Sequence, residues 1–426
     1  MNVLILGSGG REHAIAWKIS KSQDLTNLYV APGNAGTSDV AQNVDVSATD
    51  FEQVKAFVLQ KEIGLVVVGP EQPLVDGIVD YFGKDPDLIN TLILGPSARA
   101  SLLEGSKDFA KNFMKKYNVP TAAYQSFSRD QLEQAKAFLR QLKPPYVLKA
   151  DGLAAGKGVL IANDFEQAEK ALTDMLVDEK FGVASEVVVI EEFLDGMECS
   201  VFAITDGTDY KILPVAKDYK RIGEGDTGLN TGGMGCVSPV PFVDEGFMQK
   251  VESKIIKPTI KGIQMENLKF NGFLFLGLMN VDGEPYVIEY NIRLGDPEAQ
   301  VILPRVKSDF LELCLGAAKN ELASTSIEIN DEYALSVIAA SGGYPEKYEK
   351  QKQISGLDEE LGAMIFQAGT TKDNRNITIT SGGRVLAVTA MAENIKQARE
   401  KAYHALEKIH FEKIYYRKDI GKDLLE

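Results

Sequence analysis

The clearest pattern of apolar and polar positions in this chain predicts a hairpin followed by a helix. Apolar strands are predicted at 273–279 and 286–290, and the dipeptide Asp282-Gly283 stands between them. Such a dipeptide favours a two-residue turn. Side chains two positions apart lie on the same face of a strand. The second strand should therefore present one polar face, which the following residues extend.

That polar face carries Glu289, Asn291 and, if the strand continues, Arg293. A carboxylate and an amide oxygen suit Mg²⁺, and a guanidinium beyond them suits a planar anion such as a carboxylate. The alternative is a solvated polar face on which Arg293 merely pairs with Asp296 or Glu298. The DPE sequence that starts at Asp296 predicts a helix start, with aspartate as N-cap and proline at the first position.

The first hundred residues alternate short apolar strands with helices, as in a parallel α/β sheet. Strands are predicted at 1–5, 28–31, 65–68 and 91–94. One helix is predicted to follow the glycine-rich turn after the first strand and to end at about residue 21, and two more are predicted at 51–61 and 74–82. Loops after the C-terminal ends of parallel strands are where open α/β sheets bind ligands. The loops at 7–11, 32–36 and 69–73 therefore become candidates for a binding site.

The glycine-rich turn after the first strand favours phosphate binding over dinucleotide binding. A dinucleotide fingerprint needs glycine at position 12, where Glu12 stands. We predict instead a single phosphate held by the Gly9 and Gly10 amides and Arg11. The alternative is a tight turn with a surface arginine. His13, inside the helix start, is expected to pack or cap.

A second glycine-rich segment, 151–158, lies between predicted strands at 146–150 and 159–162. It is not a Walker A loop, because the glycine spacing is one short and a strand follows it. We predict a hairpin loop that folds over a triphosphate, with Lys149 on the strand and Lys157 in the loop. An ordinary hairpin with solvated lysines is the alternative.

The rest of the chain supplies further elements. Strands are predicted at 121–127, 187–194, 198–204, 210–215, 333–340 and 384–391, and helices at 107–117, 129–142, 242–265, 308–319 and 395–408. The strand at 187–194 ends in two carboxylates, which can meet an adenine edge and a ribose. The loop at 222–235 is long and rich in glycine, which is typical of a functional loop. The segment after 327 carries no motif of its own.

Composition narrows the class of protein. A chain of 426 residues predicts roughly three domains. No apolar run is long enough for a membrane span, and no signal-peptide pattern is present. Three widely spaced cysteines predict reduced thiols in a cytoplasm, and only three histidines exclude a histidine-rich metal site. The net charge of −15 argues against nucleic acid or an anionic membrane as partner.

Taken together, the motifs resemble those of one enzyme family, the phosphoribosylamine–glycine ligases of the ATP-grasp superfamily. The motifs that carry this resemblance are GGREHA at 9–14, PGNAG at 32–36, KADGLAAGKG at 149–158, EEFL at 191–194, NTGGMG at 230–235 and RLGDPE at 293–298. The resemblance covers the chain from residue 7 to 421. It implies a mixed α/β and α+β fold in three domains. These are a Rossmann-like parallel-sheet domain at 1–103, an ATP-grasp domain at 104–326 with a mobile lid at about 120–190, and a small α+β domain at 327–426.

The resemblance implies a reaction in which ATP, glycine and 5-phosphoribosylamine give ADP, phosphate and glycinamide ribonucleotide through glycyl phosphate. It also implies roles for single residues. Those expected to bind ATP are Lys107, Lys149, Gly156, Lys157, Gly158, Glu191, Glu192, Phe193, Leu194 and Glu198. Those expected to bind Mg²⁺ or Mn²⁺ are Glu289 and Asn291. Those expected to bind the substrates are Gly9, Gly10, Arg11, Asn34, Glu71, Asp218, Lys220 and Arg293, of which the last three also act in catalysis.

The chain departs from the family pattern at four positions. Lys217 and Tyr219 stand where glutamine and histidine are usual, so an imidazole has no role here and a positive charge is expected beside the substrates. Leu229 and Leu294 replace proline and phenylalanine, which we expect to be packing changes. Two other functions remain open, namely another ATP-grasp ligase or carboxylase subunit, and a nucleotide-binding protein without turnover. We expect a cytoplasmic monomer.

Overall fold

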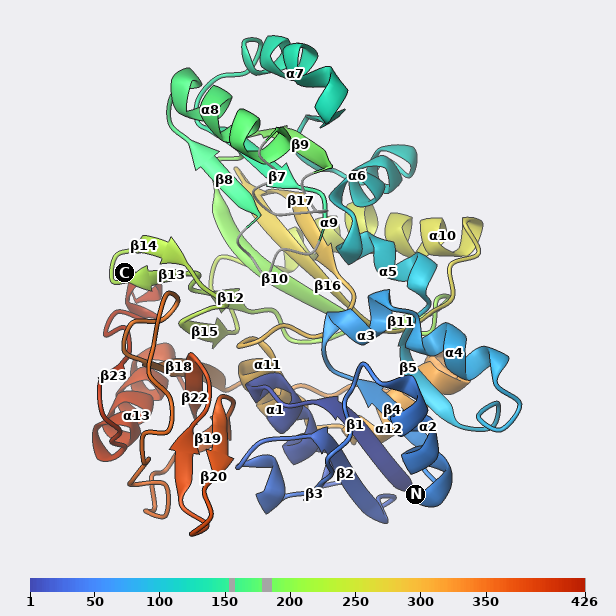
Figure 1. Cartoon of the computed structure of the whole chain (residues 1–426), viewed down its shortest axis with the longest axis vertical. Helices are drawn as coiled ribbons and strands as arrows, with labels where there is room; N and C mark the ends of the chain where they lie inside the picture. Colours follow the sequence, from blue (N-terminus) through green and yellow to red (C-terminus); the bar gives the residue numbers. More distant parts are fainter. Residues whose placement is uncertain (153–157, 178–185, 426) are drawn as a thin grey trace.

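A computed structural model describes residues 1–152, 158–177 and 186–425. The fold is mixed α/β, and the predicted fold class is confirmed. In Figure 1 the segment from β6 to β9 (residues 124–192), called the lid below, forms the top of the molecule. The N-terminal sheet forms its base, and the C-terminal sheet lies at its lower left. Within the described ranges, no helix has both the length and the apolar character needed to cross a membrane.

The N-terminal sheet is parallel, as predicted. Its strands, in the spatial order β5-β4-β1-β2-β3, are β5 (Leu92–Pro96), β4 (Leu65–Val68), β1 (Asn2–Gly7), β2 (Asn27–Pro32) and β3 (Gln42–Asn43). All four residues of β4 are buried, because helices cover both faces of such a sheet. The helical elements of this part are α1 (Gly10–Ile19), η1 (Thr37–Asp39), α2 (Phe51–Gln60), α3 (Glu71–Val75), α4 (Ile78–Lys84) and α5 (Ala98–Gly105).

The single helix predicted at 74–82 is wrong. The chain forms α3 and α4 instead, and Gly77 between them has a φ of 90°. A helix cannot continue through this left-handed conformation, which glycine adopts without steric cost. The sequence reading also missed α5, whose Ser97 cap accepts a hydrogen bond from Ala100 N.

The central sheet continues directly from the N-terminal one. β5 pairs with β16 (Phe270–Val281), which pairs in turn with β10 (Met197–Thr205) and β17 (Glu284–Asn291), and β11 (Tyr210–Ile212) lies at the edge. The predicted hairpin is confirmed, since Asp282 and Gly283 both have positive φ values, 52° and 81°. Two central residues with positive φ are what a type I′ turn requires.

The central part of the chain contributes further helical elements. They are α6 (Lys107–Lys116), α9 (Glu245–Val251), the π-helical η4 (Glu252–Ile256), α10 (Lys257–Met265), α11 (Ala299–Arg305), α12 (Phe310–Lys319) and the 3₁₀ segment η5 (Leu322–Ser324). Ser106 caps α6, because its hydroxyl accepts a hydrogen bond from Phe109 N. The helix predicted at 242–265 begins three residues later than expected and contains the π-helical turn. Asp296 does not cap a helix, because α11 begins only at Ala299.

The lid is a four-stranded antiparallel sheet with two helices and a core of its own. Its strand order is β6 (Tyr124–Ser128), β9 (Val187–Glu192), β7 (Tyr146–Ala150) and β8 (Val159–Ala162). The helical elements are η2 (Arg129–Gln131), α7 (Leu132–Leu139) and α8 (Phe165–Leu176), and the two α-helices lie on the outer side of the lid in Figure 1. One hydrophobic cluster is built entirely from described residues of this region.

The C-terminal sheet includes two strands, β12 and β15, that come from the central part of the chain. Its order is β12 (Lys217–Asp218), β15 (Gly235–Ser238), β18 (Tyr333–Ser341), β22 (Arg384–Ala392) and β19 (Met364–Gln367), with β23 (Ile414–Tyr415) also on β18. The remaining elements are α13 (Ile395–Lys408), η6 (Lys422–Leu424) and the hairpins β13 (Arg221–Gly223) with β14 (Thr227–Asn230) and β20 (Thr370–Lys372) with β21 (Thr378–Thr380). The predicted boundaries at 103 and 326 stay predictions, and strand pairing crosses both.

Candidate active site

The end of β17 supplies a carboxylate that no described group hydrogen-bonds. Glu289 lies opposite Gly277 of β16, and a Cβ on Gly277 would come within 3.2 Å of the Glu289 Cγ. Burial acts to raise the pKa of Glu289, but Lys220, Lys149 and Lys107 outweigh it, and the pKa is lowered. Glu289 is therefore an ionised carboxylate that is free to bind a ligand.

Arg293 follows the strand and bridges three elements. Its Nε lies 3.1 Å from Glu71 Oε2, and its Nη2 lies 2.7 Å from Glu104 Oε1 and 3.4 Å from Asn291 Oδ1. Its Nη1 donates to the Leu294 carbonyl at 3.2 Å. The alternative considered from the sequence, in which Arg293 pairs with Asp296 or Glu298, is therefore wrong. One of the five guanidinium N–H groups has no partner among the described residues and is available to a ligand.

A buried cluster of lysines lies where the lid meets the central sheet. The Glu191 carboxylate pairs with Lys149 Nζ at 2.9 Å and with Lys111 Nζ at 2.8 Å. Lys149 also donates to the Ile288 carbonyl, and Lys107 Nζ donates to the Gly152 carbonyl at 3.1 Å. Lys107, Lys111 and Lys149 are called the lysine half of the site below.

Lys111 is a member of this half that the sequence reading missed. It is 2 % exposed, and burial lowers its pKa to about 8. The sequence contains a pattern that could have identified Lys111. It lies on the buried face of α6 together with Ala110, Phe113 and Met114. A lysine on the apolar face of a helix is rare unless it is paired.

The segment 191–194, which was predicted to contact adenine and ribose, has only some of its side chains free to do so. The Glu191 side chain is held between two lysines, so it is not free to contact a nucleotide. Glu192 accepts from Ala123 N at 2.8 Å, Phe193 is 39 % exposed, and Leu194 is half-buried. Gly158 is buried immediately before β8. The predicted ATP ligands Gly156 and Lys157 lie outside the described residues.

The glycine turn before α1 already holds a carboxylate. Glu12 Oε2 accepts from Gly9 N at 2.6 Å, and Glu12 Oε1 lies 2.5 Å from Arg11 Nε. Arg11 also donates to the Leu294 carbonyl at 3.1 Å. The predicted phosphate cradle is therefore not formed as expected, because Glu12 occupies the Gly9 amide and would have to move. The Gly10 backbone remains close to the RLGDPE segment and to α11, since a Cβ there would lie 3.5 Å from Asp296 Oδ1 and 2.5 Å from Gln300 Nε2.

Asn34 links the second N-terminal loop to the C-terminal domain. Its Nδ2 donates to the carbonyls of Ser8 and Gln367, at 2.9 and 2.8 Å. The Gln367 N–H donates to His13 Nδ1 at 2.8 Å, and the His13 ring packs edge-on against Phe366. Burial lowers the pKa of His13 to about 4, which keeps the ring neutral. The prediction that His13 is a packing residue is confirmed.

The C-terminal domain also contacts the RLGDPE segment, which its lack of motifs had not indicated. Arg384 Nη2 lies 2.8 Å from Asp296 Oδ2, and Arg384 Nη1 donates to the Asp296 and Gly232 carbonyls. Asp296 Oδ1 accepts from Gln300 Nε2 at 2.5 Å. Asp296 therefore joins this segment to the C-terminal sheet and to the glycine-rich loop, which explains why it is not a helix cap.

Lys217 and Tyr219, two of the residues that depart from the family pattern, have side chains that point away from the site. Tyr219 is 2 % exposed, its hydroxyl donates to Asp423 Oδ1 at 2.6 Å and accepts from Gly421 N, and Lys217 pairs with Asp423. The expectation that Lys217 places a positive charge beside the substrates is therefore wrong. Alternation along the strand places Asp218 and Lys220 on the opposite face, where Lys220 pairs with Glu198.

Of the two other departures, only one is a packing position. Leu294 is buried in a core that joins α1, α11 and α12. Leu229 lies on β14 and is 52 % exposed. The expectation of a packing change is therefore confirmed for Leu294 and wrong for Leu229.

The other half of the site contains an excess of carboxylates. This carboxylate half is formed by Glu71, Glu104, Glu198, Asp218, Glu289 and Glu298 together with Lys220 and Arg293. The described residues include no group of three histidine, cysteine, aspartate or glutamate side chains arranged to hold a metal alone. A metal here would need ligands that a phosphate supplies, as Mg²⁺ commonly does. The site thus has a cationic half and an anionic half, with Glu289 at their boundary.

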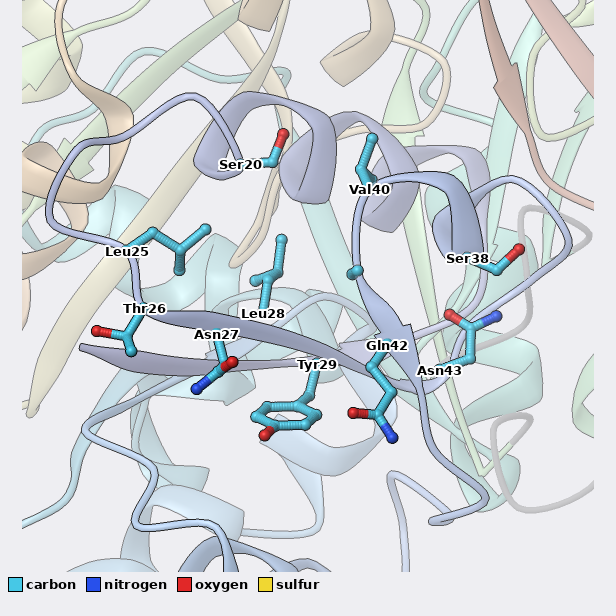
Figure 2. A pocket seen from close by; sticks show the side chains of 11 residues that line it. Ser20, Leu25, Thr26, Asn27, Leu28, Tyr29, Ser38, Val40, Gln42 and Asn43 are labelled. Atoms are coloured by element: carbon cyan, nitrogen blue, oxygen red, sulfur yellow. The ribbon is translucent and has the colours of Figure 1, made fainter.

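A cavity of about 770 Å³ lies elsewhere, along the outer edge of the N-terminal sheet. Figure 2 shows it between the end of α1, where Ser20 lies, and strands β2 and β3, which contribute Tyr29 and Gln42. It contains no ionisable acid or base other than the Tyr29 phenol, and none of the predicted site residues. It has no evident link to the chemistry of the site.

Comparison with known proteins assigns this architecture. Residues 1–104, 105–299 and 334–423 match the N, ATP-grasp (A) and C domains of the phosphoribosylglycinamide synthetase family model. The chain is 45% identical over 431 residues to the phosphoribosylamine–glycine ligase of Escherichia coli K12, covering 100% of this chain and 99% of that protein.

Solved structures agree with this assignment. The crystal structure of phosphoribosylamine–glycine ligase from Thermotoga maritima matches with a TM-score of 0.86 and 37% identity, over 99% of this chain and 100% of that one. A biotin carboxylase from Campylobacter jejuni, solved as a β,γ-ATP complex, matches with a TM-score of 0.72 over 97% of this chain and 92% of that one. Its identity is only 16%, so this second match shows the fold alone.

Proposed function

Since the chain belongs to the phosphoribosylglycinamide synthetase family, we propose that it joins glycine to 5-phosphoribosylamine at the expense of ATP. The glycine carboxylate would attack the γ-phosphate of ATP, which releases ADP and forms glycyl phosphate. The amine of phosphoribosylamine would then attack the glycyl carbonyl, lose a proton and expel phosphate. The observation that carries the proposal is the division of one site into a lysine half and a carboxylate half that meet at Glu289.

The lysine half would hold the ATP phosphates. Lys107 and Lys149 have their ammonium groups at the junction of the lid and the central sheet, and Lys111 fixes the Glu191 carboxylate against Lys149. Burial lowers the pKa of Lys107, although Glu289 opposes this effect. Phosphoryl transfer depends on positioning and charge neutralisation, which fixed lysines supply without a covalent intermediate on the protein. Glu192, Phe193 and Leu194 would line the base and ribose.

Glu289 and Asn291 would hold Mg²⁺ or Mn²⁺. The residues fit such an ion, because both donors are oxygens, Glu289 is ionised and receives no hydrogen bond from a described residue, and the neighbouring lysines can hold the phosphates that complete the shell. When bound, the ion would neutralise charge on the transferred phosphoryl group. Arg293 would use its remaining N–H to orient the glycine carboxylate. Asp218 and Lys220 would position the two substrates.

The other two functions are less well supported. A carboxylase would use bicarbonate in place of glycine, and the biotin carboxylase match extends to the fold alone. A binding protein without turnover would not require Glu289, Lys107 and Lys149 to converge. We further propose that the enzyme acts as a cytoplasmic monomer. Its three cysteines are buried free thiols, as expected in a reducing compartment.

Product analysis tests the proposed function. Freshly prepared phosphoribosylamine, glycine, ATP and Mg²⁺ should give glycinamide ribonucleotide by mass spectrometry, and one ADP should form per product. Omission of either co-substrate should stop product formation. ADP formation that requires bicarbonate in place of glycine would identify a carboxylase, and nucleotide binding without any ADP formation would identify a binding protein.

Replacement of Tyr219 by histidine should change turnover by less than tenfold. The side chain lies on the face of the strand opposite Asp218, so an imidazole at this position cannot exchange a proton with a substrate. Tyr219→Phe should retain activity and lower the free energy of unfolding by about 1 kcal/mol, because it removes the bond to Asp423. Steady-state kinetics and thermal unfolding provide the two measurements. A tenfold or larger gain in turnover for Tyr219→His would contradict this placement.

A further inference from the structure

The hairpin β13–β14 forms most of the glycine-rich loop and has no hydrophobic core of its own. All four residues of β14 are exposed, and residues 221–230 contribute to none of the hydrophobic clusters in the described part of the chain. A two-stranded hairpin by itself is at best marginally stable in water. Contacts with another segment must therefore hold it, and Figure 1 shows it beside the C-terminal end of the chain.

Arg417 joins this hairpin to the segment 415–423, called the tail below. Arg417 is 1 % exposed, and its Nη1 lies 2.6 Å from Asp226 Oδ1 and 3.1 Å from the Arg221 carbonyl oxygen. Its Nε and Nη2 bond the two oxygens of Asp419 at 2.8 and 2.7 Å. Asp419 Oδ2 also accepts from Gly225 N at 2.8 Å. Arginine is rarely buried unless it is paired, and here its planar fork bonds the tail and the hairpin at the same time.

Two further residues of the tail bond to the hairpin. The Tyr415 hydroxyl donates to the Ile222 carbonyl at 2.7 Å. The Lys418 N–H donates to Glu224 Oε1 at 3.2 Å. Polar bonds from the tail therefore extend along β13 and around the turn, where they take the place of the missing core.

The tail is itself anchored to the C-terminal domain. The Tyr403 hydroxyl of α13 donates to the Arg417 carbonyl at 2.7 Å and accepts from Ile420 N at 3.2 Å. Arg399 Nε donates to the Ile420 carbonyl at 3.1 Å. The Ile420 side chain is buried in the hydrophobic cluster of the C-terminal sheet. The tail is therefore a fixed support, to which the hairpin is attached by polar bonds.

The hairpin in turn lies between two parts of the carboxylate half of the site. At its start, Thr231 N and Oγ1 donate to the Lys220 carbonyl at 2.8 and 2.9 Å, and the Lys220 side chain pairs with Glu198. After its end, Gly233 packs against the RLGDPE segment, since a Cβ on Gly233 would meet Pro297 Cδ at 2.5 Å. A shift of the hairpin would therefore move the backbone of Lys220 and the loop beside the RLGDPE segment together.

We propose that Arg417 is a positioning residue for the carboxylate half of the site, and that it acts by fixing the hairpin β13–β14 to the tail. This inference rests on the proposed function, because positioning matters only if substrates bind beside Lys220. Arg417 touches no substrate, since its guanidinium is surrounded by the hairpin and the tail. A small displacement that begins far from the reacting atoms can lower the rate strongly, because substrates must be held in a precise geometry.

Two variants test the proposal by kinetics. Arg417→Lys keeps the positive charge but loses the planar fork, and should raise the KM for glycine by about tenfold, since charged hydrogen bonds are lost. Asp226→Asn should raise it by about threefold, because the Asp226 side chain is 58 % exposed and such a pair is weaker. This second variant will fold, since asparagine tolerates the φ of 54° at position 226. The affinity for ADP, measured by calorimetry, should stay within about twofold in both, because Lys107 and Lys149 lie on distant elements.

Hydrogen exchange supplies a second readout that does not depend on turnover. Backbone amides of residues 222–230 should exchange about tenfold faster in Arg417→Lys than in the wild type, because the hairpin opens locally once its support is weakened. Amides of β18 and β22 should keep their wild-type rates. Asp373→Asn is the matched control, since Asp373 pairs with Arg375 at the turn of the other hairpin of this domain, β20–β21. It should change neither the KM for glycine nor the exchange of residues 222–230.

The double variant tests whether Arg417 and Asp226 act through one contact. Its KM for glycine should be close to that of Arg417→Lys alone, because both changes weaken the same bond. Effects of the two single changes that multiply in the double variant would show that the residues act independently, which would contradict the proposal.

The remaining outcomes would overturn the proposal in distinct ways. Faster exchange of the hairpin with an unchanged KM for glycine would show that the hairpin does not position the site. Unchanged exchange in both single variants would show that the tail does not hold the hairpin. Faster exchange of β18 and β22 as well would show that Arg417 serves the folding of the whole C-terminal domain. Failure of the wild-type protein to use glycine at all would instead overturn the proposed function.

Discussion

Replacement of Glu289 by alanine should lower turnover by roughly a thousandfold, which corresponds to about 4 kcal/mol of transition-state stabilisation. Glu289 is the only ionised carboxylate of the proposed metal pair, and no other described residue hydrogen-bonds it. Asn291 alone could not hold a divalent ion against its hydration shell. Nucleotide binding should survive in part, because Lys107 and Lys149 remain. Single-turnover rates and ADP affinity measured by calorimetry provide the comparison.

Glu284→Ala supplies a matched control on the same strand. Glu284 lies at the opposite end of β17 and pairs with Lys250 and Lys254 at the surface. Its loss should leave turnover within twofold of the wild-type value, because exposed ion pairs contribute little. Excess chelator should abolish wild-type turnover, and Mn²⁺ or Mg²⁺ should restore it. Full activity of Glu289→Ala, or of the wild type in chelator, would remove the basis for a metal at this position.

Arg293→Lys should weaken the use of glycine by ten- to a hundredfold and leave the apparent affinity for ATP nearly unchanged. The guanidinium bridges Glu71 of α3 and Glu104 of α5 and still offers one N–H to a carboxylate. An ammonium group lacks the planar fork and cannot reach all of these positions together. The KM for glycine and the turnover number from steady-state kinetics are the quantities to compare.

Glu104→Gln separates binding by Arg293 from its structural role. Burial raises the pKa of Glu104, so this carboxylate depends on Arg293 for its charge. The glutamine variant keeps the guanidinium but loosens it, and should raise the KM for glycine less than Arg293→Lys does. If Arg293→Lys lowers stability alone and leaves both kinetic constants unchanged, Arg293 serves only to join α3 and α5.

Local patterns of the sequence predicted the strands that carry Lys149, Glu289 and Asn291, but not the helices α3 and α5 that carry Glu71 and Glu104. The Asp282-Gly283 turn and the alternation beyond it placed Glu289 and Asn291 at the end of a strand, because turn chemistry and strand period depend on neighbouring residues. The same alternation at 217–220 implies that Asp218 and Lys220 share a face, although the sequence reading did not use it. Such relations span only a few residues.

Contacts across the chain could not be predicted in this way. Arg293 pairs with Glu71 and Glu104, which are 222 and 189 positions away. Arg384 reaches Asp296 from a domain that carries no motif. The pattern at 9–14 correctly predicted a turn before a helix, but it could not show that Glu12 would fill that turn. Pairing partners depend on how the sheets are joined, which local periodicity does not specify.

The way the hydrophobic clusters divide the chain has a consequence for its unfolding. One cluster contains residues from Leu4 to Ile292, and a second contains residues from Val3 to Ala387, so the N-terminal and central parts share their cores. The cluster of the lid contains only residues between Phe127 and Ile190. Segments that share a core unfold together, and a segment with its own core can open separately. Backbone amides of the lid sheet should therefore exchange with deuterium through a local opening, while those of β1, β4 and β16 exchange only when the whole remainder unfolds. The enzyme could thus admit and release a nucleotide at a small cost in free energy without loosening the strands that hold Glu289 and Asn291.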